Sequence, residues 1–331
     1  MQTRIACMVC YAAIFKDVIR VSEMFEKLNV ENKDAFDKAI KDLETGKFIV
    51  IKDGFAALPY LVEKILNKAA DFNRSEQLIH SKIKFLKKLG KLPLIKFIGI
   101  SGSVAAGNPV KDFENKLDID IFVITGKQLI WFFCIPMIFA RLFQRKNTAN
   151  TMCFNYILDE SDLMIYNRNL YTAHEIRNLI PISGMDTYNK FLQTNNWVNC
   201  YFPGFINNPT DLPNHVSNEL VNKLMFLIYT GFRCIKKFTL KPLREISFKV
   251  DPVKHLNINR MSSLYGGYQA LVQKNFTKIF NTSFPELKED KLIEKLFGDE
   301  LSIAIKKADY NIEEFYNQAG IQILYQNKYE Q

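Results

Sequence analysis

Short, nearly continuous apolar runs mark the middle of the chain, whereas apolar residues elsewhere recur mainly at helical spacing. Three such runs, bounded by turn residues, are Leu94 to Ile100, Leu117 to Ile124 and Thr151 to Leu158. Runs of this kind predict buried strands, because a strand covered on both faces needs apolar residues at consecutive positions. The pattern therefore predicts an α/β (α+β) protein whose sheet lies in the middle of the sequence.

The N-terminal pattern predicts three helices followed by a hairpin. Apolar residues at helical spacing place the helices over Ile5 to Phe15, Val21 to Leu28 and Lys33 to Leu43, with Asn32 as the N-cap of the third. The dipeptide Asp53-Gly54 between two short apolar runs is a strong hairpin signal. Three helices and a two-stranded wing resemble a winged-helix domain, which we assign to residues 1–60.

The charges of this winged-helix-like region do not favour DNA binding. Its nine basic residues are matched by nine acidic ones. The third helix, which would read DNA in such a domain, carries Asp34, Asp37, Asp42 and Glu44. Phosphate contacts need a basic face. We therefore expect the region to pack against the rest of the chain or to dock another macromolecule, rather than to bind DNA by itself.

Two carboxylates stand on the second predicted strand, shortly after a glycine–serine turn. Asp118 and Asp120 are two residues apart, so a strand projects both from one face, about 6–7 Å apart at Cα. Carboxylates that close repel each other unless a cation lies between them, and hard oxygen ligands suit Mg²⁺. The turn at Gly102 and Ser103 offers backbone N–H groups and a hydroxyl to a phosphate. Together these features indicate phosphoryl or nucleotidyl transfer.

The pair Gly102-Ser103, followed by Asp118-Ile119-Asp120, resembles the signature of the polymerase-beta-type nucleotidyltransferase superfamily, and Gly107 matches a later glycine of that motif. The resemblance covers residues 95–165 and implies a small mixed sheet, a nucleoside triphosphate and metal ions, Mg²⁺ or Mn²⁺. It implies that Asp118 and Asp120 are catalytic and bind the metal, and that Gly102 and Ser103 bind the nucleotide. The layout of the whole chain also resembles uncharacterised prokaryotic nucleotidyltransferase-domain proteins.

The sequence departs from that signature in two places. Residues Val110 to Lys116 make the loop before Asp118 longer than usual. The strand that usually supplies a third carboxylate carries Asn155 instead, with Asp159 and Asp162 just beyond it as alternative ligands. An asparagine ligates through its carbonyl oxygen but brings no charge.

Two hypotheses therefore stay open. The first is a metal-dependent nucleotidyltransferase that moves a nucleoside monophosphate to an acceptor, which can be a small molecule, a protein or RNA. The second is a catalytically weak or inactive nucleotide-binding regulatory protein with a winged-helix docking module.

The rest of the chain is predicted to be helical on both sides of the nucleotidyltransferase core, residues 94–166. We expect residues 61–93 to form a connector whose basic second half is either a solvated helix face or a border of the phosphate site. Residues 167–331 are expected to form a helical C-terminal domain, in which Thr172 caps a helix that contains Glu175. Basic residues of the connector are Lys82, Lys84, Lys87, Lys88 and Lys91. Further C-terminal helices are predicted over His215 to Lys236, Ser262 to Phe280, Leu292 to Phe297 and Ile312 to Leu324.

Composition adds three expectations. The net charge of +9 favours anionic partners or simply a basic surface. The six cysteines lie in apolar stretches, which suits reduced thiols and a cytoplasmic protein, and the spacing of Cys7 and Cys10 favours core packing over a metal site. The most apolar run, Leu129 to Ala140, is shorter than the roughly 20 residues that span a bilayer, so we expect no transmembrane segment and a helix packed on the sheet.

Overall fold

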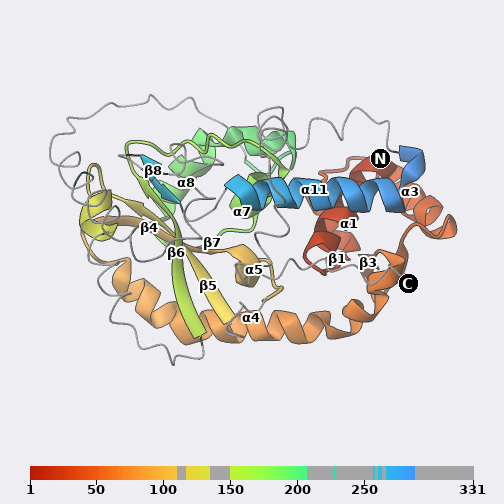
Figure 1. Cartoon of the computed structure of the whole chain (residues 1–331), viewed down its shortest axis with the longest axis horizontal. Coiled ribbons are helices and arrows are strands. Elements are labelled where there is room, and N and C mark those ends of the chain that lie inside the picture. Colours follow the sequence, from red (N-terminus) through yellow and green to blue (C-terminus); the bar gives the residue numbers. More distant parts are fainter. Residues whose placement is uncertain are drawn as a thin grey trace.

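The computed structural model describes residues 1–109, 117–134, 150–206, 227, 256–257, 260–262 and 266–287. The predicted insertion Val110 to Lys116 and the predicted helices Leu292 to Phe297 and Ile312 to Leu324 lie outside these residues. So does all of the predicted helix His215 to Lys236 except Leu227. Within the described residues, the protein combines helices with two small sheets, one of them mixed (Figure 1). The predicted mixture of helices and strands is confirmed.

The larger sheet contains the three runs that were predicted as strands. Its members are β4 (Ile95–Ser101), β5 (Leu117–Thr125), β6 (Asn150–Asp159), β7 (Ile180–Ser183), β8 (Leu256–Asn257) and β9 (Arg260–Ser262). They lie in the order β7-β4-β5-β6-β9-β8. The pair β5–β6 is parallel, and the other described pairs are antiparallel. Strand β5 therefore lies inside the sheet, with β4 on one edge and β6 on the other.

Helices cover both faces of this sheet. They are α4 (Val62–Leu89) on one face, and α7 (Leu170–Arg177), α8 (Met185–Thr194) and the 3₁₀ helix η2 (Asn196–Cys200) on the other. Ile119 and Ile121 of β5 belong to the buried cluster that includes Leu86 of α4. Phe122 and Ile124 belong to a second cluster, which includes residues of α7 and α8. Since side chains alternate along a strand, the even-numbered positions of β5 face α7 and α8.

Part of the most apolar run also packs on the sheet. Residues 130–134 are helical, and Trp131 and Cys134 are fully buried in the cluster that contains Leu86. Packing on the sheet is therefore confirmed for this part of the predicted helix, while residues 135–140 lie outside the described part. Among the helices that are described, none combines the length and the apolar character needed to cross a membrane.

The predicted N-terminal helices and hairpin are present. They are α1 (Gln2–Ile14), α2 (Val21–Lys27), α3 (Lys33–Thr45), β2 (Val50–Lys52) and β3 (Phe55–Ala57). As predicted, Asn32 caps α3, because its side-chain oxygen accepts a hydrogen bond of 3.0 Å from the N–H of Ala35. Asp53 and Gly54 have φ angles of 52° and 76°, the left-handed pair that a two-residue hairpin turn needs.

One strand at the N-terminus was not predicted. Strand β1 (Ile19–Arg20) pairs with β3 and completes a three-stranded sheet in the order β1-β3-β2. Two residues are too few to show an alternating pattern, so the sequence carried no signal for it. The resulting order of elements is helix, strand, helix, helix and hairpin.

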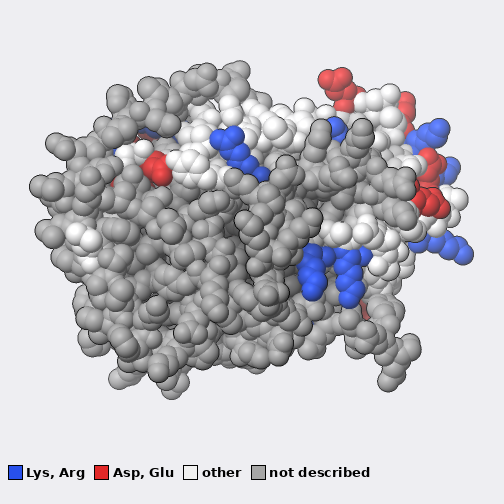
Figure 2. Space-filling view, turned by 45° about the horizontal axis from the view of Figure 1, so that its top comes forward, with Lys and Arg blue, Asp and Glu red and all other residues white. Residues whose placement is uncertain are grey.

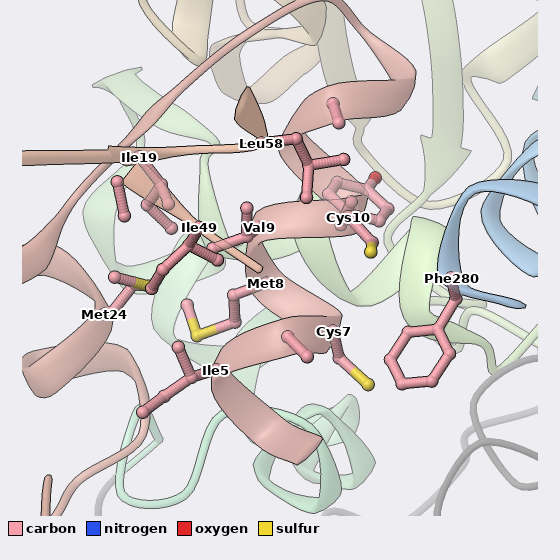
Figure 3. Packing of buried hydrophobic residues seen from close by; sticks show 14 of the residues in the cluster. Ile5, Cys7, Met8, Val9, Cys10, Ile19, Met24, Ile49, Leu58 and Phe280 are labelled. Atoms are coloured by element: carbon pink, nitrogen blue, oxygen red, sulfur yellow. The ribbon is translucent and has the colours of Figure 1, made fainter. Parts of the chain in front are cut away.

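The N-terminal helices share a hydrophobic core with a helix from much later in the chain. Phe276 and Phe280 of α11 (Gly266–Ser283) are fully buried in the same cluster as Ile5, Cys7 and Cys10 of α1. Figure 3 shows the cysteine side chains of α1 on the side toward Phe280. Both cysteines are buried in this cluster, as the core-packing interpretation of the C-x-x-C spacing predicted.

A buried ion pair joins α4 to the N-terminal elements. Nζ of Lys68 lies 2.7 and 2.8 Å from the carboxylate oxygens of Asp17, and it donates to the carbonyl of Gly107 over 3.2 Å. Burial raises the pKa of Asp17 in spite of the opposing charge of Lys68. Desolvation therefore affects the pKa of Asp17 more than the charge of Lys68 does. A pair of this kind fixes the relative position of the two segments but adds little net stability.

We expect Lys68→Met to lower the free energy of unfolding by roughly 3–5 kcal/mol, because it leaves the Asp17 carboxylate buried without its partner. Urea unfolding followed by tryptophan fluorescence measures the change. The control is Lys64→Met, since Lys64 is 28% exposed and its partner Asp71 also lies 3.7 Å from Arg74. Equal losses in the two variants, or no recovery in Asp17→Asn/Lys68→Met, would contradict this account.

Candidate metal and phosphate site

The paired strands β4 and β5 bring the predicted site residues to one end of the sheet. Ser101 at the end of β4 pairs with Asp120, and Gly102 and Ser103 open the short helix α5 (Gly102–Ala105) directly afterwards. Asp118 and Asp120 lie at even-numbered positions of β5, so they point toward α7 and α8 rather than toward α4.

Gly102 lies so close to Asp120 that a side chain at this position would displace the carboxylate. Its φ angle is +70°, a left-handed conformation that favours glycine. A Cβ atom at this position would overlap with Oδ2 of Asp120. The turn and the carboxylate pair are thus in direct contact, as phosphate and cation binding at one site require.

Asp118, Asp120 and Cys153 form a group that can hold a cation. One ligand atom from each side chain lies within 4.8 Å of the other two. Cys153 is in the group because it pairs with Asp120 across the parallel strands. An octahedral ion with bonds of about 2.1 Å brings its oxygen ligands to within about 4.2 Å of one another, so the two carboxylates fit Mg²⁺ or Mn²⁺ after a small adjustment. The sulfur atom adds affinity for a softer ion such as Zn²⁺.

Asn155 reaches Asp120 through an irregularity in β6. This strand has one extra residue between its pairings with Ile121 and Phe122, which leaves Asn155 in a β-bulge. Its Nδ2 donates a hydrogen bond to Oδ1 of Asp120, and its Oδ1 accepts a 3.2 Å hydrogen bond from the thiol of Cys153. Asn155 therefore stands where the third carboxylate was expected, but it presents a donor to the aspartate.

The two alternative carboxylates do not lie at the site. Asp159 pairs with Thr125, five residues along β5 from Asp120, so the strand rise separates it from the site by about 17 Å. Its carboxylate accepts hydrogen bonds from the N–H and the hydroxyl of Ser161. Asp162 follows beyond the end of that strand.

A carboxylate that sequence reasoning missed reaches the site from α7. Asn169 caps this helix in a reciprocal arrangement with Thr172, so the predicted cap, Thr172, is instead the third residue of the helix. In this register, Oε2 of Glu175 accepts a hydrogen bond of 3.3 Å from the N–H of Gly102, and its charge interacts with that of Asp120. No local pattern could reveal the contact, because it depends on how α7 packs on the sheet.

Burial of acidic groups dominates the electrostatics of the site. It raises the pKa of Asp120 well above its ordinary value, and the charges of Asp118 and Glu175 raise it further. Burial also raises the pKa of Glu175 to about 7, although the hydrogen bond from Gly102 acts in the opposite direction. Three close carboxylates cannot all be charged cheaply, so either protons or a divalent cation must relieve the repulsion.

The basic half of the connector lies away from this site. Helix α4 covers the face of the sheet opposite to Asp118 and Asp120. Its lysines project from the outer side of the helix, where Lys84, Lys87 and Lys88 are exposed. The interpretation in which they border the phosphate site is therefore wrong.

In comparisons with known proteins, no family model, curated protein or solved structure matched the chain. The functional assignment consequently depends on the geometry above and on the motif formed by Gly102, Ser103, Asp118 and Asp120.

We expect Gly102→Ala to weaken Mn²⁺ binding by at least tenfold, because the new methyl group displaces the Asp120 carboxylate. Isothermal titration calorimetry measures the affinity. The control is Gly54→Ala: Gly54 has a φ angle of +76° with nothing within 4 Å of an added Cβ, so this variant carries only the backbone strain of about 1–2 kcal/mol. If both variants bind Mn²⁺ equally well, Asp120 does not hold the ion.

Glu175→Gln is expected to stabilise the metal-free protein at alkaline pH and to have little effect at acid pH. The pKa of about 7 in the fold exceeds the ordinary value of 4.5, so the fold favours the protonated acid, and wild-type stability falls as the pH rises between these values. At about 1.4 kcal/mol per pKa unit, the gain reaches roughly 3 kcal/mol above about pH 8.

Urea unfolding in EDTA at about pH 5 and about pH 8.5 measures this difference. Glu76→Gln is the control, because Glu76 is an exposed glutamate of α4. A stabilisation by Glu175→Gln of the same size at both pH values would show that removal of a buried charge is not its cause.

Proposed function

We propose that the protein is a metal-dependent nucleotidyltransferase, which moves a nucleoside monophosphate from a nucleoside triphosphate to an acceptor. The observation that carries the proposal is the contact of Gly102 with Asp120, which sets a glycine–serine turn beside a carboxylate pair on a strand. In this chemistry, phosphate recognition and cation binding must be adjacent, because a cation held by the carboxylates would supply positive charge to the phosphate oxygens.

Each residue has a distinct role in the proposed reaction. Asp118 and Asp120 hold the cation, while the N–H of Gly102 and the hydroxyl of Ser103 position the β- and γ-phosphates. A hydroxyl or amine of the acceptor attacks the α-phosphorus, the bond to the bridging oxygen breaks, and pyrophosphate leaves; the acceptor's proton passes to solvent. Bound Mg²⁺ or Mn²⁺ supplies positive charge that stabilises the phosphate oxygens during transfer.

Two contacts favour a second candidate function, a catalytically weak or inactive nucleotide-binding regulatory protein. Asn155 brings an amide to Asp120, so the site has less negative charge for a cation than a third carboxylate would give. Glu175 accepts the hydrogen bond of the Gly102 N–H, the group that would otherwise meet a phosphate. On this proposal, the N-terminal helices and hairpin act as a winged-helix-like docking module.

We expect Mg²⁺- or Mn²⁺-dependent release of pyrophosphate from at least one ribonucleoside triphosphate, in the presence of a cell extract that supplies acceptors. Asp118→Asn is expected to reduce the rate by at least a hundredfold, since it removes charge from the cation site without changing the size of the side chain. A coupled colorimetric assay measures the release. Asp162→Asn is the control, because it removes a carboxylate beyond the end of β6.

Each outcome distinguishes the two functions. Release that Asp118→Asn abolishes and Asp162→Asn preserves supports the transferase. Nucleotide binding without release supports the regulatory protein. Tight Zn²⁺ binding that Cys153→Ser abolishes, with no nucleotide binding, would overturn both.

A further inference from the structure

The C-terminal half of α4 presents a continuous row of lysines on its outer side. Residues 77–109 contain no aspartate or glutamate. Within this stretch Lys84, Lys87, Lys88 and Lys91 are all exposed. Lys84, Lys87 and Lys88 are spaced i, i+3 and i+4, so they lie on one face of the helix, and Lys91 follows in the turn just after the helix end at Leu89. These four residues are called the lysine row below.

The lysine row faces outward because the opposite side of α4 is buried. Leu78 and Leu86 are 5% and 0% exposed and pack in the cluster on the sheet. The end of the helix is fixed as well, since a Cβ on Gly90 would overlap with the side chain of Ser183 in β7. The lysine row is therefore held on a rigid element.

The basic residues in the first half of α4 lie near carboxylates, whereas those of the lysine row do not form such pairs among the described residues. In the first half, Lys64 and Arg74 lie near Asp71, and Lys68 lies against Asp17. None of the ion pairs found among the described residues involves the lysine row. Lys87 and Lys88 lie in the last turn of α4, where positive charge interacts favourably with the helix dipole, whereas Lys84 precedes that turn and Lys91 follows the helix. Like charges at these spacings also repel each other by a few tenths of a kcal/mol per pair, so helix stability alone does not explain the row.

An apolar group is exposed along the flank of the lysine row. The Phe85 ring is 49% exposed although it stands next to Lys84. A membrane-bound helix inserts its apolar face, but the apolar face of α4 is already buried against the sheet. Exposed lysines beside an exposed aromatic ring suit a single-stranded nucleic acid instead. The lysines contact its phosphates, and its bases stack on the ring.

We propose that the lysine row binds the phosphate backbone of a single-stranded nucleic acid, with Phe85 as a stacking platform. This surface lies on the face of the sheet opposite to Asp118 and Asp120. The inference therefore does not depend on the proposed transferase function.

The experiment measures the affinity of the full chain for a fluorescein-labelled, mixed-sequence RNA of about 20 nucleotides by fluorescence anisotropy, between about 50 and 200 mM salt. The test variant replaces the lysine row by glutamine: Lys84→Gln, Lys87→Gln, Lys88→Gln and Lys91→Gln. The matched control removes four exposed lysines from the N-terminal elements: Lys33→Gln, Lys38→Gln, Lys41→Gln and Lys52→Gln. Both variants have the same net charge, so only the location of the lost charge differs.

We expect the test variant to bind at least tenfold more weakly at low salt. The slope of log affinity against log salt is expected to flatten by up to about 3, because each phosphate contact with a single strand contributes about 0.7. Phe85→Ala should weaken binding about fivefold without changing that slope, since stacking releases no counterions.

Three results would overturn the proposal. The first is no measurable RNA binding by the wild-type chain at low salt. The second is an equal loss of affinity in the test variant and the control, which would reflect net charge alone. The third is binding to phosphatidylserine vesicles, with no RNA binding, that is lost in the test variant, which would assign the row to a membrane surface.

Discussion

The contact between Gly102 and the Asp120 carboxylate is the constraint on which the candidate site depends. The antiparallel pairing of β4 with β5 sets Ser101 opposite Asp120, so the chain must turn away immediately afterwards. It turns in a left-handed conformation that only glycine adopts without strain, and the missing Cβ leaves the space that the carboxylate occupies. The backbone geometry of the turn and the position of the Asp120 carboxylate are therefore coupled.

This packing has an electrostatic consequence. Asp118, Asp120 and Glu175 are brought together where burial already disfavours their charged forms. Without a counter-charge, the burial of these carboxylates lowers the stability of the fold. A bound cation would lower the pKa values of the carboxylates and offset that cost. The repulsion is thus better explained as a property of a ligand site than as a requirement of the fold.

Glu175 and a bound phosphate would compete for the same hydrogen-bond donor. Its carboxylate accepts a hydrogen bond from the N–H of Gly102, and a phosphate would seek the same donor. Two anions cannot share one N–H favourably, so a bound triphosphate requires Glu175 to be protonated or to move. Since its pKa is about 7, protonation costs little near neutral pH. The contact with Gly102 therefore opposes a bound phosphate, whereas the raised pKa of Glu175 lowers the cost of removing that opposition.

The sequence predicted what local patterns control and missed what packing controls. The strands β4 and β5, the Asn32 cap and the Asp53-Gly54 turn are each specified by neighbouring residues, and all are present. Cys153 enters the site through the register of parallel strands, and Glu175 enters through the docking of a helix. Neither strand register nor helix docking can be predicted from the spacing of residues along the chain.

The sequence could not predict which face of the sheet α4 covers, because that also depends on packing. The position of α4 separates the roles of its two halves. Its first half carries Lys68, which contacts Asp17 of the N-terminal elements and the carbonyl of Gly107, a few residues after the turn at Gly102 and Ser103. The side chain of Asn108 adds a hydrogen bond of 3.0 Å to the carbonyl of Phe15. The turn at Gly102 and Ser103 is therefore linked to the N-terminal elements, whereas the lysine row at the other end of α4 takes part in none of the ion pairs found in the described part of the chain. A partner that displaces the N-terminal elements would therefore disturb this turn, because the hydrogen bond of Asn108 and the ion pair of Lys68 would be lost.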